Sequence, residues 1–271
     1  MEYPKEFGNL IELAKDEYKG ELIGVGNPAS NILLIGKEPA IPKEKKPQRL
    51  LEIEENCEQW EINYKLRIDI SDVPSMDENR YRYNPLYPYK GQKCMVYIEK
   101  IVEDRIIPIR GKGGTSKTWY QYQKLWDFIY KGKKSSRSDT INYHEHCFST
   151  ELSSANEKYS YLANSVDCKI SLGNRKKLLC HSFYQEFPIV ILAVGHYPKE
   201  HGIDIESIFH VKWIEPTHEV GKFWYNIHNS ITNNPKLVIH TNQLSMVSDD
   251  LIKEIADRII EFKNNHNITL I

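Results

Sequence analysis

The stretch Asn31-Ile-Leu-Leu-Ile-Gly-Lys-Glu-Pro-Ala40 decides the fold class of this sequence. Its apolar residues run without interruption up to Gly36, and such a run is typical of a strand buried on both faces in a parallel sheet. Ligand sites in open parallel sheets lie at the carboxyl ends of the strands. Lys37 and Glu38 follow this strand directly, so we expect them at the sheet edge where ligands bind.

Three later segments also have strand character and end in glycine or polar residues. They are residues 145–154, which end near Thr150-Glu151, residues 187–195, which end at Gly195 before His196, and residues 237–245, which contain His240-Thr-Asn-Gln243. The carboxyl ends of parallel strands share one edge of a sheet. We therefore expect the polar residues after all four strands to converge on one crevice.

Helical periodicity alternates with these strands. Amphipathic patterns are found in residues 5–19, 117–130 and 249–263; residues 48–66, 174–186 and 220–232 also have helical character, and residues 205–216 indicate a strand or edge segment. Alternating strands and amphipathic helices are the signature of an α/β fold. No internal repeat or convincing linker divides the chain, so we predict one domain over 1–271 with an insertion at about 48–110.

Composition excludes several classes of protein. The net charge is −1, which argues against strong non-specific binding to duplex nucleic acid. The five cysteines are odd in number and lack a C-x-x-C motif, so a disulfide framework or zinc ribbon is not expected. The charged N-terminus has no signal-peptide h-region, and no apolar run is long enough to cross a membrane. We expect a cytoplasmic protein with no cofactor, no metal and no evident obligate protein partner.

The four strand ends together resemble the uracil-DNA glycosylase superfamily. The motifs that carry the resemblance are Gly36-Lys-Glu-Pro39, Ser149-Thr-Glu151, Ile191-Leu-Ala-Val-Gly195 and His240-Thr-Asn-Gln-Leu-Ser245, in the family's order. The resemblance spans roughly residues 22 to 263. It implies a three-layer α/β/α sandwich with a central four-stranded, mostly parallel sheet. It also implies a partner that is DNA or a nucleobase or nucleotide ligand.

The resemblance further implies roles for individual residues. Glu38 would position or activate the attacking water, and His240 would hydrogen-bond the departing base. Leu244 and Met246 would lie in a loop that wedges into the duplex and fills the place of a flipped base. The residues expected to bind the substrate are Gly36, Lys37, Thr150, Glu151, Asn242, Gln243 and Ser245.

The chain departs from the family pattern at the residue that would read the base. Glu151 occupies the position of an asparagine, and an ionised glutamate only accepts hydrogen bonds. It should favour bases with donor edges, or a ligand that is not a base. Thr241 and Asn242 also replace the proline and serine that follow the family's histidine.

Simpler interpretations stay open for most of these residues. Lys37 and Glu38 would then form a solvated ion pair, and Glu151 would cap a helix beginning at Ser153. The basic loop 131–138 is either a solvated turn or a phosphate contact. Aromatic residues of 81–89 and 119–126 either pack in the core or stack on a base. His144 and His146 lie two residues apart without a third ligand, so a metal site is not expected.

The leading hypothesis is a divergent DNA glycosylase that hydrolyses the N-glycosidic bond of a flipped, damaged or mismatched base. The alternative is a non-catalytic nucleotide-binding or nucleic-acid-binding protein of the same fold. A third candidate is another α/β hydrolase that uses Glu38 and His240 on a different substrate. It would not be an α/β-hydrolase of the usual kind, because the sequence has no G-x-S-x-G motif.

Overall fold

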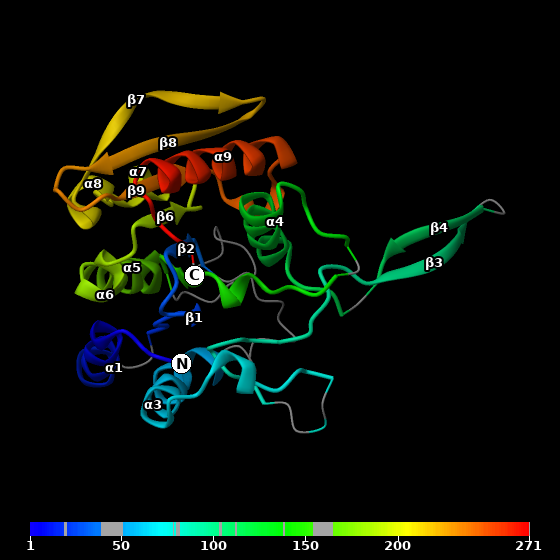
Figure 1. The fold of residues 1–271 in the computed structure, drawn as a ribbon, viewed down its shortest axis with the longest axis horizontal. Helices are drawn as coiled ribbons and strands as arrows, with labels where there is room; N and C mark the ends of the chain where they lie inside the picture. Colours follow the sequence, from blue (N-terminus) through cyan, green and yellow to red (C-terminus); the bar gives the residue numbers. More distant parts are fainter. Residues whose placement is uncertain are drawn as a thin grey trace.

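A mixed seven-stranded sheet forms the centre of the molecule (Figure 1). The computed structural model describes residues 1–18, 21–38, 51–77, 79, 82–102, 105–111, 113–137, 139–153 and 165–270. The strands of the sheet are β1 (Val25–Gly26), β2 (Ile32–Gly36), β5 (Phe148–Glu151), β6 (Ile189–Leu192), β7 (Val211–Val220), β8 (Phe223–Ser230) and β9 (Leu237–Thr241). Their spatial order is β1-β5-β2-β6-β9-β8-β7.

The four neighbouring strands β5, β2, β6 and β9 run parallel to one another. These are the four strands that the sequence predicts. The sheet is larger than the predicted four strands, because β1 extends it antiparallel to β5, and β8 and β7 extend it antiparallel to β9. Of the parallel strands, β2 and β6 are apolar and β9 begins with three apolar residues, whereas β1 is only two residues long and β7 is largely exposed, so the added strands carry a weaker sequence signal.

The prediction of a helix over 220–232 is wrong, because β8 occupies this segment. Its buried residues Tyr225 and His228 lie three positions apart, which imitates the period of a helix. In the strand they belong to opposite faces, and β8 is held by pairing with both β7 and β9. Residues 205–216 also differ from the prediction, since they begin as helix α8 (Ile205–Phe209) before β7 starts.

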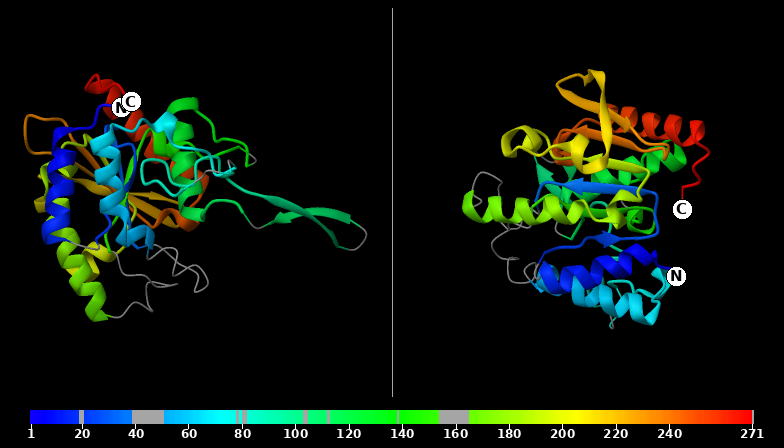
Figure 2. Two further views of the ribbon diagram at one scale, coloured as in Figure 1. Left: turned by 90° about the horizontal axis from the view of Figure 1, so that it is seen from below. Right: turned by 90° about the vertical axis from the view of Figure 1, so that its left-hand side faces the viewer.

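Helices pack on both faces of the sheet (Figure 2). Along β2, Leu33 and Ile35 belong to one apolar cluster, and Ile32 and Leu34 belong to another. The helices of the first cluster are α1 (Lys5–Glu17), α3 (Asn56–Leu66), α5 (Ser165–Leu179), α6 (Ser182–Gln185), α7 (Tyr197–His201) and α8; those of the second are α4 (Lys117–Lys131) and α9 (Asp249–Asn265).

The predicted helices at 5–19, 117–130 and 249–263 are confirmed as α1, α4 and α9, apart from residue 19, which lies outside the described residues. Ser116 caps α4 by accepting a hydrogen bond from the Trp119 amide at 3.1 Å. Ser248 caps α9 in the same way through the Leu251 amide at 3.3 Å. These serine caps satisfy backbone donors that the first turn of a helix leaves unpaired.

The segment expected as an insertion, 48–110, has two different structural parts. Its helix α3 packs against α1, and Trp60 of α3 is fully buried in the first cluster. Strands β3 (Tyr97–Val102) and β4 (Arg105–Arg110) instead form a two-stranded hairpin that projects from the rest of the molecule (Figure 1). Short 3-10 turns η2 (Ile70–Asp72), η3 (Tyr143–Glu145) and η5 (Leu244–Met246) complete the structure.

Candidate functional site

The carboxyl ends of the four parallel strands meet at one edge of the sheet, as the sequence predicts. Gly36 at the end of β2 pairs in register with Glu151 at the end of β5. On the other side, Leu192 at the end of β6 pairs with His240 on β9. The residues that follow these ends are therefore neighbours in space, although they are far apart in sequence.

Glu38 is buried at this edge and is held by a tyrosine. Its side chain is only 7% exposed, and its Oε2 accepts a hydrogen bond of 2.5 Å from the Tyr197 hydroxyl. The Lys37 ammonium lies 4.4 Å from the centre of the Tyr197 ring, a cation–π contact. No ion pair joins Lys37 to Glu38 among the described residues, so the solvated ion pair considered from the sequence is wrong. Pro39, the last residue of this motif, lies outside the described part of the chain.

Gly195 joins the β2 end to the β9 end. Its backbone is left-handed, with φ of +58°, a conformation in which a side chain is strained. A Cβ on this residue would lie 3.5 Å from Lys37 Cε and 3.8 Å from the Gln243 amide nitrogen. The Gly195 amide donates to the Thr241 carbonyl at 2.9 Å. A Cβ would fit at these distances, so the left-handed backbone, and not a lack of space, is the reason that glycine suits this position.

His240 is fixed by the same glycine. Its Nε2 lies 2.7 Å from the Gly195 carbonyl oxygen, and because a carbonyl only accepts, Nε2 carries the proton. Burial lowers the pKa of His240 to about 4, so the ring is neutral at pH 7 and its Nδ1 is a hydrogen-bond acceptor. Trp224 packs edge-on against the ring at 4.9 Å. In this state Nδ1 of His240 is able to accept a hydrogen bond, whereas donation to a departing base would require a second proton or a turned ring.

Some of the residues that follow His240 bond β9 to its neighbour β8, and others lie partly exposed at the carboxyl end of β9. The Asn242 Oδ1 accepts from the Trp224 amide at 2.8 Å, and the Thr241 hydroxyl donates to the Trp224 carbonyl at 2.7 Å. Asn242 and Thr241 therefore tie β9 to β8. Gln243 and Ser245 are partly exposed beside this contact.

The two residues predicted to wedge into the duplex, Leu244 and Met246, both lie in the η5 turn but differ in burial. Leu244 is fully buried in the cluster shared by α4 and α9, so its assignment as a wedge residue is corrected to a core residue. A residue that enters a duplex has to be exposed. Met246 meets that requirement, since it is 69% exposed, and its sulfur lies 3.5 Å from the Lys117 ammonium.

The Thr150 side chain contacts a buried arginine, Arg175, which is not among the site residues predicted from the sequence. Its hydroxyl donates to the Ile23 carbonyl at 2.9 Å and accepts from Arg175 Nη2 at 2.7 Å. Arg175 is fully buried, and it also donates from Nε to the Glu151 carbonyl at 2.9 Å and from Nη1 to the Leu22 carbonyl. The contacts of Thr150 are thus internal, and Arg175 fixes the backbone from which Glu151 extends.

The Glu151 side chain lies on the opposite side of β5, beside an aromatic group. A Cβ on Gly36 would lie 3.3 Å from the Tyr122 hydroxyl and 3.8 Å from Glu151 Cδ. Burial, together with the negative charge of Glu151, raises the pKa of Tyr122. The Glu151 carboxylate therefore places a hydrogen-bond acceptor next to the end of β2, and the neutral Tyr122 side chain lies beside it.

A succession of ring contacts begins at Tyr122. It includes residues from the two aromatic regions that were predicted either to pack in the core or to stack on a base. Ring-centre distances are 5.7 Å for Tyr122–Tyr143, 4.0 Å for Tyr143–His144, 4.8 Å for His144–Trp119, 6.1 Å for Trp119–Tyr89 and 5.9 Å for Tyr89–Tyr83. Trp119, Tyr83 and Tyr89 are partly exposed, whereas Trp126 is core. The 82–89 and 119–122 regions thus meet in one group, while Tyr81 lies outside the described residues.

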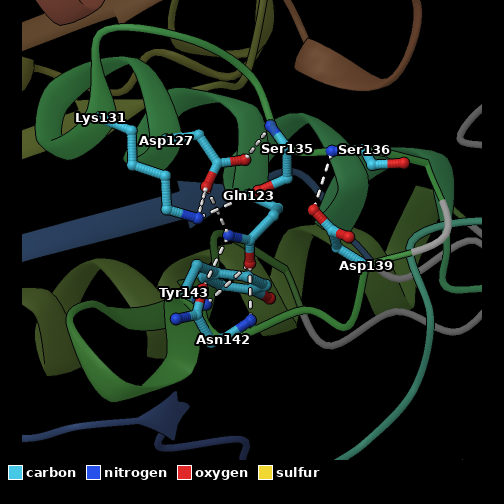
Figure 3. A network of polar contacts seen from close by, with 8 residues as sticks. All are labelled: Gln123, Asp127, Lys131, Ser135, Ser136, Asp139, Asn142 and Tyr143. Atoms are coloured by element: carbon cyan, nitrogen blue, oxygen red, sulfur yellow. Dashed lines mark hydrogen bonds and ion pairs between the residues drawn. The ribbon is translucent and has the colours of Figure 1, made fainter.

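A polar network on α4 holds the turn that carries two of these rings (Figure 3). Gln123 accepts from the backbone amides of Asn142 at 2.6 Å and Tyr143 at 2.9 Å. It donates to Asp127, which is also bonded to the Lys131 ammonium at 3.1 Å and to the Ser135 amide at 2.8 Å. The network anchors both the η3 turn and the basic loop 131–138, whose residue 138 lies outside the described chain.

His144 and His146 lie on the η3 turn and just after it rather than on a strand. His144 is fully buried among aromatic rings, and burial lowers its pKa to about 3. No group of three or more His, Cys, Asp or Glu side chains in the described ranges is arranged to hold a metal ion. Cys57, Cys94, Cys147 and Cys180 are free thiols.

Comparisons with protein-family models, curated proteins and solved structures found no match to this chain. Within the described residues, no helix combines the length and apolar character needed to cross a membrane.

Proposed function

We propose that the chain is a divergent uracil-DNA-glycosylase-like protein that acts on a nucleobase in DNA. The observation that carries the proposal is the junction at residues 195–197. Tyr197 holds the Glu38 carboxylate, and Gly195 holds the His240 ring, so both candidate groups are attached to one turn. The parallel order β5-β2-β6-β9 with helices on both faces supports the three-layer sandwich of that superfamily.

The proposed reaction is hydrolysis of the bond between the deoxyribose C1′ and a base nitrogen. That bond breaks with its electron pair leaving on the base, and the sugar develops oxocarbenium character. Glu38 would stabilise this positive charge and orient water for attack on C1′. Tyr197 occupies one lone pair of Glu38 Oε2, and the carboxylate has further lone pairs for a water molecule.

The acceptors at this edge favour a base that presents N–H donors. Glu151 only accepts, and neutral His240 offers its Nδ1 lone pair, because Nε2–H is used by Gly195. Uracil presents carbonyl oxygens that neither group can satisfy in this state. An amino-bearing damaged or mismatched base would suit either acceptor better, and the partly exposed Trp119 and Tyr89, which continue the ring contacts from Tyr122 beside Glu151, are candidates to stack on it.

Purified protein incubated with oligonucleotides carrying single modified or mismatched bases tests the proposal. Uracil, hypoxanthine, xanthine and each mismatch would be offered in single-stranded and duplex DNA, and abasic sites would be cleaved with alkali. We expect product with the wild type and a loss of about 10²-fold or more with Glu38→Gln. Glu200→Gln, an exposed change on the neighbouring helix α7, is the matched control. Absence of abasic product from every oligonucleotide would reject the glycosylase activity.

A second candidate function is nucleotide or nucleic-acid binding without catalysis. The specific observation in its favour is that the Nε2 proton of His240 is already donated to Gly195, which removes the donor expected to stabilise a leaving base. A binding titration of labelled oligonucleotides at several salt concentrations separates the two functions. Binding without product favours the second, and its salt dependence reports the number of phosphate contacts.

A further inference from the structure

We propose that the groove between α8 and the β7–β8 hairpin is a binding site for a guanidinium group. It is separate from Glu38 and does not depend on the proposed base chemistry. The groove has a volume of about 330 Å³ and opens to solvent. Its polar and aromatic lining consists of Asp204, Glu206, Trp213, Thr217, Asn226 and His228.

Two residues that line this groove each carry a buried polar atom with no hydrogen-bond partner in the described part of the chain. The atoms are His228 Nδ1 and Asn226 Oδ1. His228 is only 5% exposed, and a buried polar atom without a partner is costly. Burial lowers the pKa of His228, so the ring is neutral at neutral pH and one of its two nitrogens is an acceptor. A ligand that donates hydrogen bonds would satisfy both atoms.

The charges around these atoms favour a cation. Asp204 and Glu206 line the groove, and hydrogen bonds from the Lys212 ammonium and the Trp213 amide lower the pKa of Glu206. Lys212 lies 2.8 Å from Glu206, on the exposed side of the hairpin. Two carboxylates and one ammonium leave the groove with a net negative charge. Asp204 also accepts from the Ser207 amide at 3.0 Å, which fixes it at the start of α8.

The number and kind of lining groups distinguish a guanidinium from other cations. Asp204, Glu206, Asn226 and His228 all present acceptors, and a guanidinium carries five N–H donors in a plane, whereas an ammonium has three. Trp213 is 41% exposed and offers a ring face on which a planar cation can stack. The described residues include no three-ligand metal arrangement, so an organic cation suits the groove better than a metal ion.

Isothermal titration of the full-length protein with a matched pair of ligands tests this site. The pair is Nα-acetyl-arginine amide and Nα-acetyl-lysine amide, which differ in the cationic head. We expect the arginine compound to bind at least about tenfold more tightly. Agmatine, titrated in parallel, reports whether the guanidinium is recognised as a free small molecule or on an amino-acid backbone; tighter binding of either arginine-like compound supports the site.

The variants Asp204→Asn with Glu206→Gln remove both charges but keep the helix cap, since asparagine caps as well as aspartate. We expect them to weaken binding about tenfold or more. Glu219→Gln, an exposed change on β7 outside the groove, is the matched control and should bind like the wild type. Trp213→Ala is an independent second variant that leaves the carboxylates in place.

Equal binding of the arginine and lysine compounds, or full binding by the double variant, would overturn the proposal. Thermal unfolding midpoints near the wild-type value would establish that each variant is folded before its affinity is compared. Glu38→Gln should leave this binding unchanged, so a failure of the glycosylase proposal and a failure of the guanidinium site are distinguishable.

Discussion

Replacing Arg175 by methionine tests whether a buried guanidinium holds the end of β5 in place. Arg175 is fully buried and donates to the Glu151 carbonyl at 2.9 Å, to the Thr150 hydroxyl at 2.7 Å and to the Leu22 carbonyl. Each hydrogen bond to a charged group contributes about 1.5–3 kcal/mol. Desolvation of the guanidinium offsets several kcal/mol of that sum. We therefore expect the free energy of unfolding to fall by about 3–5 kcal/mol.

Urea unfolding, followed by circular dichroism and by tryptophan fluorescence, measures this loss as a shift of the midpoint with an unchanged slope. Lys176→Met is the matched control, because Lys176 is exposed on the same helix and its replacement should change stability by less than about 0.5 kcal/mol. Arg175→Lys keeps the charge but not the planar set of donors, so it should also destabilise the protein. A loss below about 1 kcal/mol in Arg175→Met would refute the reasoning.

Two further predictions concern the core and the response to pH. Leu244→Ala should lower the free energy of unfolding by about 2–5 kcal/mol, because Leu244 is fully buried. Met246→Ala should change it by less than about 0.5 kcal/mol, because Met246 is exposed. Equal effects of the two substitutions in denaturant titrations would contradict the placement of Leu244 in the core. Burial lowers the folded-state pKa of His240 to about 4 and that of His144 to about 3. As the pH falls, these histidines therefore bind protons in the unfolded chain before they do so in the folded protein. The free energy of unfolding should fall as the pH drops from about 6.5 toward 4. Urea midpoints at pH 7 and pH 4.5 would measure the fall, which His240→Asn should reduce; a midpoint independent of pH would contradict it.

The strands at the centre of the sheet could be predicted because their sequences report burial directly. β2 and β6 are continuous apolar runs and β9 begins with Leu237-Val-Ile239, a composition typical of strands covered on both faces. The segment of β8 could not be predicted, because its buried Tyr225 and His228 belong to two different faces and imitate a helical period. Pairing with neighbours on both sides, which sequence spacing does not encode, decides its structure.

The strand ends that carry the candidate residues could be predicted, but the contacts that hold these residues could not. Glu38 and His240 could be found because each follows an apolar run. The partner of Glu38 is Tyr197, 159 residues away in sequence, and no local pattern connects the two. Leu244 illustrates a related limit: the direction of a side chain in a loop depends on the turn that carries it, and η5 turns this leucine inward.

The position of β2 between β5 and β6 has a consequence for the synthesis of the chain. Leu34 pairs with Ser149 on one side and with Ile191 on the other, so both neighbours of β2 are made long after it. Pairing between distant segments slows folding, and an unpaired apolar strand exposes surface on which chains associate. β2 is thus the first of the four parallel strands to be translated but gains its second neighbour only when β6 has been made, and residues 32–35 depend on the later half of the protein for protection from self-association.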